Sequence, residues 1–211
     1  MEESTFNFRK AESSNALIFF PDISGFTKFV NHTEINHSQL IIVDLLETII
    51  ETLTLPFTIS EIEGDAILFY KYGEPSGIEE LIQESKNIFI KFHNRLQTIV
   101  THNHCNCGAC SGAHNLTLKF IVHYGIVNKI KIGNFTKLFG RDLIIAHRLL
   151  KNSLNQHEYI FLSENYTNAL STNFIPDEDW IEIIDGTENL KDLDKINYKA
   201  ILLSSLRKQI L

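Results

Sequence analysis

The sequence predicts an α+β fold, in which helices pack on a mostly antiparallel sheet. Apolar residues recur at three- and four-residue steps over residues 38–53 and 78–100, which is typical of helices that face a core. Short apolar runs joined by a glycine turn, 57–63 and 66–70, are typical of neighbouring antiparallel strands. We therefore expect one domain over residues 16–211.

The expected elements follow the same logic along the chain. The uninterrupted apolar run 16–20 predicts a buried strand, Pro56 ends the first long helix, and Gly64 with Asp65 turns the hairpin tightly. Gly125 is expected to separate two further paired strands. We predict strands at 16–20, 57–63, 66–70, 116–124, 126–132, 159–162, 180–184 and 196–203, and helices at 38–53, 78–100, 142–151 and 164–170.

Charge and hydropathy exclude several classes of function. The net charge is −7 and no Lys/Arg-rich run occurs, which argues against a nucleic-acid partner. No apolar run approaches the roughly 20 residues that span a bilayer, so we expect no membrane partner. The polar N-terminal segment, 1–15, lacks the apolar core of a signal peptide, which favours a cytoplasmic location.

Two aspartates occupy similar positions beside small residues. Asp22 follows the first strand and precedes Ser24 and Gly25, and Asp65 follows Gly64 in the hairpin turn. If the first strand pairs with the hairpin, both carboxylates meet at one edge of the sheet, where hard divalent cations such as magnesium bind. The alternative is that Asp22 caps the following turn and Asp65 fills an ordinary turn position.

Four motifs in one order add a family resemblance. The chain carries "FPDISGFT", "EGDAILF", "KFIVHYG" and "FGRDLIIAHRL". Together they resemble the class III adenylyl and guanylyl cyclases over residues 16–170. The resemblance implies that family's ferredoxin-like sandwich, with helices on a mostly antiparallel sheet. It also implies a reaction that converts a nucleoside triphosphate to a 3′,5′-cyclic monophosphate and pyrophosphate.

The resemblance assigns metal and phosphate ligands. Asp22, Asp65 and the backbone carbonyl of Ile23 would hold two Mg²⁺ or Mn²⁺ ions, which bring the attacking and leaving oxygens into line. Backbone amides from Ser24 onwards would cradle the phosphates. This phosphate-binding turn includes Gly25, Phe26 and Thr27.

The family works as a head-to-tail dimer, so the resemblance implies a homodimer with shared sites. Arg148 matches the arginine that stabilises charge on the transferring phosphate. Glu61 and Lys137 match the two positions that read the base. A carboxylate that accepts from guanine N1 and N2 and an ammonium that donates to O6 favour GTP over ATP. The same pair also fits a pyrimidine, or adenine with the donor and acceptor roles exchanged. The alternative is that Glu61 and Lys137 are ordinary exposed charges.

One position departs from the family. Its last motif normally has an asparagine that orients the ribose where this chain has Ile144. His147 is a substitute donor, or simply a core or surface histidine. Losing one oriented polar contact costs about 10² to 10³ in rate. The sequence therefore leaves open an active cyclase, a catalytically degenerate nucleotide-binding or regulatory domain, and an interaction module that keeps only the fold.

A Cys/His-rich insert at 101–115 is a second departure. Cys105, Cys107, Cys110 and His114 supply the donors of a structural tetrahedral zinc site. The alternative is a polar loop with reduced cysteines.

Overall fold

The computed structural model describes residues 13–210 except 32, 103–106, 173 and 194. These residues form an eight-stranded sheet in the order β2-β3-β1-β4-β6-β8-β7, and β5 pairs with β4. Strands β4 and β6 are parallel, and every other neighbouring pair is antiparallel. The expected α+β class with a mostly antiparallel sheet is confirmed.

The strands are β1 (Ser13–Ser24), β2 (Thr58–Glu63), β3 (Ala66–Tyr72), β4 (Thr117–Ile132), β5 (Phe135–Phe139), β6 (Tyr159–Ser163), β7 (Glu182–Asn189) and β8 (Lys195–Leu202). The α-helices are α1 (Phe26–Asn31), α2 (Ile35–Thr52), α3 (Ile78–His102), α4 (Gly108–Gly112), α5 (Arg141–Leu149) and α6 (Glu164–Ala169). Short 3-10 helices follow α4 and β8, η1 (Ala113–Asn115) and η2 (Ser204–Gln209). None of the described helices combines the length and the apolar character needed to cross a membrane.

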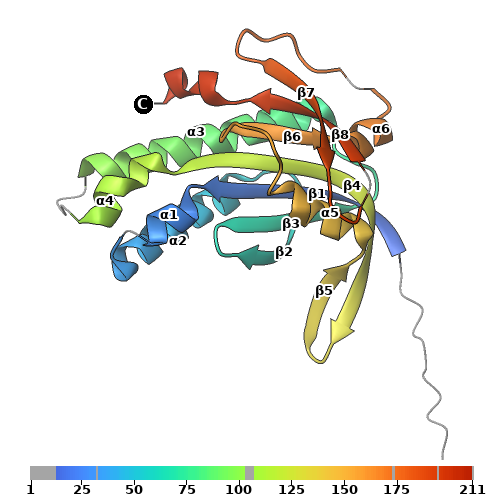
Figure 1. Ribbon diagram of the computed structural model, residues 1–211, viewed down its shortest axis with the longest axis horizontal. Coiled ribbons are helices and arrows are strands. Elements are labelled where there is room, and N and C mark those ends of the chain that lie inside the picture. Colours follow the sequence, from blue (N-terminus) through green and yellow to red (C-terminus); the bar gives the residue numbers. More distant parts are fainter. Residues whose placement is uncertain (1–12, 32, 103–106, 173, 194, 211) are drawn as a thin grey trace, which may run out of the picture.

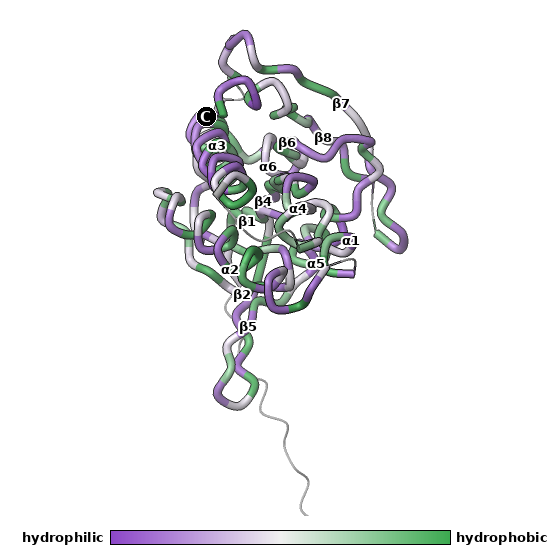
Figure 2. The backbone as a smooth tube through the Cα atoms, turned by 90° about the vertical axis from the view of Figure 1, so that its left-hand side faces the viewer, coloured by the Kyte–Doolittle hydropathy of each residue, from purple (hydrophilic) through white to green (hydrophobic). Residues whose placement is uncertain are grey.

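Helices cover both faces of the sheet (Figure 1). Alternate side chains of the central strand β1 point to opposite faces, so Leu17 and Phe19 join one core and Ile18 and Phe20 the other. Helices α2 and α3 pack on the first face, and α5 packs on the second. The tube in Figure 2 shows hydrophobic and hydrophilic residues alternating along these helices. The two long amphipathic segments predicted from the sequence are therefore the two helices of one layer.

The expected turn at Gly125 is wrong. Strand β4 runs through Gly125 without a break, and its hairpin partner is β5, reached through Gly133 at φ +60°. A Cβ on Gly125 would lie 2.2 Å from Cγ of Asp142 on α5. Glycine at this position permits the close approach of α5 to the strand, and it makes no turn.

The insert packs against the body of the protein. Ala109, Cys110 and Ala113 are buried in the same core as α2 and α3. Residues 1–12 of the expected N-terminal segment, and 103–106 of the insert, lie outside the described part of the chain. Ser13 to Asn15, which we expected in the polar segment, belong to β1.

Candidate functional site

The two aspartates singled out in the sequence lie side by side where the neighbouring strands β1 and β3 meet the same end of the sheet. In the antiparallel pairing of β1 with β3, Asp22 is opposite Ala66, the residue after Asp65. The backbone N–H of Ile23 donates to the carbonyl of Asp65 at 3.0 Å. The hairpin turn that carries Asp65 depends on Gly64 at φ +63°, a conformation that side chains disfavour. Strand pairing and this turn thus place both acids together.

The acids interact electrostatically. Burial raises the pKa of Asp65 to about 6, and the negative charge of Asp22 contributes to the increase. A cation bound between the carboxylates of Asp22 and Asp65 would favour the ionised form of Asp65. Their oxygens are the donors that Mg²⁺ and Mn²⁺ prefer, so this donor set fits such ions.

Lys119 is a site residue that our sequence reasoning missed. It lies opposite Asp22 in the β1–β4 pairing, and its Nζ is 3.0 Å from Oδ2 of Asp22. The same ammonium donates to the carbonyl of Leu150 at 2.8 Å. The position of Lys119 in the strand motif "KFIVHYG" is visible in the sequence, but only the register with β1 reveals its partner.

The predicted phosphate-binding turn lies next to the acids. Gly25 has φ +91°, helix α1 begins at Phe26, and the Phe29 N–H donates to the Gly25 carbonyl at 3.0 Å. The Phe26 ring packs beside Gly64 of the hairpin turn, whereas Thr27 is exposed. The backbone from Ser24 to Thr27 is thus held against the loop that carries Asp65.

The two residues predicted to read a base form an ion pair. Nζ of Lys137, on β5, lies 2.9 Å from Oε2 of Glu61, on β2. The hydrogen bond to Glu61 and its charge raise the pKa of Lys137. Glu63 and His147 lie nearby, with His147 Nδ1 3.5 Å from a Glu63 oxygen. Two elements distant in the sequence therefore present a carboxylate and an ammonium at one place.

Helix α5 carries Arg148 and Ile144 on its exposed side. The Arg148 guanidinium donates to the carbonyl of Lys191. Ile144, one turn earlier, is 48% exposed, so its side chain does not serve the core. An apolar group therefore occupies the surface position where the family resemblance expects a polar one.

A buried histidine fixes the start of α5. His123 on β4 is fully buried, with Nδ1 2.9 Å from Ser163 Oγ and Nε2 3.2 Å from Asp142 Oδ1. The Ile126 N–H donates to Asp142 at 2.8 Å. Burial opposes ionisation of Asp142, but these hydrogen bonds leave its pKa lowered. The histidine of "KFIVHYG" thus links β4, β6 and α5 and has a positioning role.

The predicted zinc ligands are only partly together. Cys107 and Cys110 lie with His37 of α2 in a group whose donor atoms are all within 4.8 Å of one another. His114 is outside that group, and its Nδ1 lies 2.7 Å from the Ser111 carbonyl oxygen. Cys105 lies outside the described residues. His37 was missed because its contact with the insert depends on how the insert packs on α2.

Solved structures show where this fold occurs. The adenylyl cyclase CyaB of P. aeruginosa is 17% identical with a TM-score of 0.61, and the match covers 93% of this chain and 97% of that one. The guanylyl cyclase Cya2 is 15% identical with a TM-score of 0.60, covering 92% and 95%. The guanylate cyclase domain of RhGC from Catenaria anguillulae, solved in complex with GTP, is 15% identical with a TM-score of 0.63, covering 90% and 98%. The expected class III cyclase fold is confirmed.

Sequence relatives place the chain in a family. An uncharacterized protein of Mycobacterium tuberculosis, Rv2561/Rv2562, is 29% identical over 126 residues, which is 60% of this chain. The chain spans 58% of the length of that relative. The model of a family described as a protein of unknown function, DUF2652, matches residues 42–159, more than half of the chain. The chain therefore belongs to the DUF2652 family, with the fold of the class III cyclase catalytic domains.

Proposed function

We propose that this protein is a nucleotide cyclase that converts a purine nucleoside triphosphate to a 3′,5′-cyclic monophosphate and pyrophosphate. The observation that carries the proposal is the position of Asp22 and Asp65, at adjacent strand ends of a cyclase fold. The pKa of Asp65, raised by burial and by the charge of Asp22, supports it, because a bound divalent cation would favour the ionised form of Asp65.

Asp22, Asp65 and the carbonyl of Ile23 would hold Mg²⁺ or Mn²⁺. When bound, two such ions supply positive charge at the attacking 3′-oxygen and at the leaving pyrophosphate. The backbone at Gly25, Phe26 and Thr27 would orient the phosphates beside these carboxylates, because peptide N–H groups bind phosphate oxygens without a side chain between them.

The Glu61–Lys137 pair supports a preference for GTP over ATP. A carboxylate accepts hydrogen bonds from guanine N1 and N2, and an ammonium donates to O6. The 2.9 Å contact shows that both groups reach the same place in one chain. Adenine offers an acceptor at N1 and a donor at N6, which fits this charge pair only with the two roles exchanged.

We propose that a second copy of the chain completes each site in a head-to-tail homodimer. Apolar side chains remain exposed along the β4–β5 hairpin, which projects from the sheet in Figures 1 and 2. They are Ile126, Ile132, Phe135 and Phe139. Exposed apolar groups on a projecting hairpin favour a protein partner. Arg148 would then act on phosphates held by the Asp22 and Asp65 of the other copy.

A catalytically degenerate nucleotide-binding or regulatory domain is the second candidate function. Two observations favour it. Ile144 presents no polar group where the ribose is oriented in the family, and Lys119 already supplies a positive charge to Asp22. Such a domain would bind a triphosphate and form no cyclic product.

An assay with all four nucleotides separates the candidates. Purified protein is incubated with ATP, GTP, CTP or UTP and Mn²⁺, and cyclic monophosphate is measured by mass spectrometry. We expect product from GTP, loss of product in Asp22→Ala and Asp65→Ala, and retention in Asp185→Ala. The last variant is the matched control, since Asp185 is an exposed strand acid paired with Lys199. Triphosphate binding without product would establish the second candidate, and full activity in Asp22→Ala would refute the metal assignment.

A further inference from the structure

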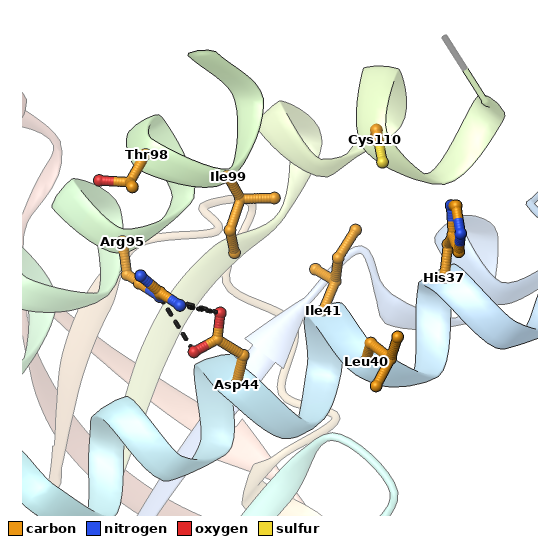
Figure 3. Close-up of a pocket in the computed structure, with 8 residues that line it drawn as sticks. All are labelled: His37, Leu40, Ile41, Asp44, Arg95, Thr98, Ile99 and Cys110. Carbon is orange, nitrogen blue, oxygen red and sulfur yellow. Dashed lines mark hydrogen bonds and ion pairs between the residues drawn. The ribbon is translucent and has the colours of Figure 1, made fainter. Parts of the chain in front are cut away.

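A histidine of α2 meets the cysteines of the insert at one end of a surface hollow. The hollow has a volume of about 350 Å³ and lies between α2, α3 and α4. Figure 3 shows the His37 imidazole on α2 pointing toward α4, which carries Cys110. This place is built from different elements than the aspartate site, so it needs a separate explanation.

The donor atoms have the separations of metal ligands. Nδ1 of His37 lies 3.1 Å from Sγ of Cys107, and the donors of His37, Cys107 and Cys110 all lie within 4.8 Å of one another. Zinc bonds of about 2.3 Å to sulfur and 2.0 Å to nitrogen in a tetrahedron require donor separations of roughly 3.5 to 3.8 Å. Changes of about 1 Å in these donor separations would therefore suffice to bind the ion.

The backbone around the cysteines is arranged for thiolates. The Cys110 N–H donates to Sγ of Cys107 at 3.4 Å, so the loop Cys107 to Cys110 wraps around one sulfur. Peptide N–H groups that point at a sulfur stabilise its negative charge. The Ala109 N–H donates to the carboxylate of Glu34, at 3.3 Å, which ties the same loop to the start of α2. The Glu34 contact and the approach of His37 to Cys107 thus both hold the insert beside α2.

We propose that His37, Cys107 and Cys110 supply three of the four ligands of a zinc ion that fastens the insert to α2, with water as the fourth. Two thiolates and one imidazole are a soft donor set that selects zinc over magnesium or calcium. On binding, each thiol releases its proton to solvent and the imidazole binds through a neutral nitrogen. The assignment replaces His114 of the sequence-based prediction by His37.

The position of the insert gives this zinc site a structural consequence. An added Cβ on Gly25 would lie 3.2 Å from the carbonyl oxygen of Asn115, the last residue of the insert. The insert therefore forms a wall of the turn that follows Asp22. A metal that holds Cys107 and Cys110 against α2 would therefore also fix the position of the insert beside Gly25.

Metal content measured on four variants tests the assignment. Full-length protein is loaded with equimolar Zn²⁺, passed through a desalting column and analysed by inductively coupled plasma mass spectrometry. We expect one zinc per chain in the wild type and in His114→Ala, an exposed histidine of the same insert. His37→Ala, Cys107→Ser and Cys110→Ser should lower zinc affinity by at least about 100-fold, because even residues that only support a ligand cost 10- to 100-fold.

Cobalt substitution gives a readout that does not depend on the variants. Co²⁺ added to the metal-free wild type should produce sulfur-to-cobalt charge-transfer absorption in the near ultraviolet, and zinc should abolish it. Wild-type protein that retains no zinc and gives no such absorption would overturn the proposal. So would zinc that is lost in His114→Ala and kept in His37→Ala. None of these readouts requires cyclase activity.

Discussion

Replacement of Gly125 by alanine is expected to destabilise the protein because Asp142 occupies the space of the new methyl group. The added Cβ would lie 2.2 Å from Cγ and 2.5 Å from Oδ2 of Asp142. Asp142 must therefore move away from the Ile126 N–H, 2.8 Å distant, and from Nε2 of buried His123. Hydrogen bonds to a charged group contribute about 1.5 to 3 kcal/mol each, so we expect a loss of about 3 to 6 kcal/mol for the two.

A double-mutant cycle distinguishes this clash from a general effect of alanine. Asp142→Gly removes the carboxylate and also the Asp142 Cβ, which would lie 2.6 Å from the new methyl group. It loses the same two hydrogen bonds and should cost about 3 to 6 kcal/mol, plus up to about 1 kcal/mol for glycine in a helix. In that background Gly125→Ala meets no carboxylate, and we expect a further cost below about 1 kcal/mol. Urea denaturation followed by circular dichroism measures all four proteins. Additive effects, or a Gly125→Ala protein as stable as wild type, would refute the reasoning.

Three further predictions follow from buried and paired charges. In EDTA, Asp65→Asn should gain thermal stability relative to wild type as the pH rises from about 4 to 6. The reason is that an unfolded aspartate ionises near pH 3.9, whereas burial raises the pKa of folded Asp65 to about 6. A stability difference that does not change with pH would contradict this. Lys119→Met should tighten Mn²⁺ binding about tenfold, as measured by calorimetry. The reason is that the Lys119 ammonium, 3.0 Å from Asp22, repels a divalent ion. Weaker binding would show that Lys119 supports the metal. Arg207→Met should lower the free energy of unfolding by about 3 kcal/mol in urea denaturation. The substitution leaves the Glu158 carboxylate, which is 9% exposed, without its guanidinium partner. An unchanged denaturation midpoint would refute that role.

Local patterns predicted the parts of the fold and site that depend on neighbouring residues. The Gly64–Asp65 hairpin follows from its turn residues, and the position of Asp22 follows from the end of an apolar strand. Gly125 was misread because glycine serves both turns and close approaches, and only the packing of Asp142 separates the two uses. The partnership of His37 with Cys107 joins residues 70 positions apart, which no local pattern can reveal.

Lys119 also affects how easily a metal ion could replace it as the partner of Asp22. Keeping an ammonium group inside a protein after it has lost its carboxylate partner costs free energy, unless another hydrogen-bond acceptor remains. Lys119 keeps one, because its Nζ also donates to the Leu150 carbonyl at 2.8 Å. Asp22 could therefore turn to a divalent ion while Lys119 stays hydrogen-bonded where it is. If the protein binds a metal–nucleotide complex as we propose, the ion pair with Lys119 would hold the Asp22 side chain in place before the complex binds.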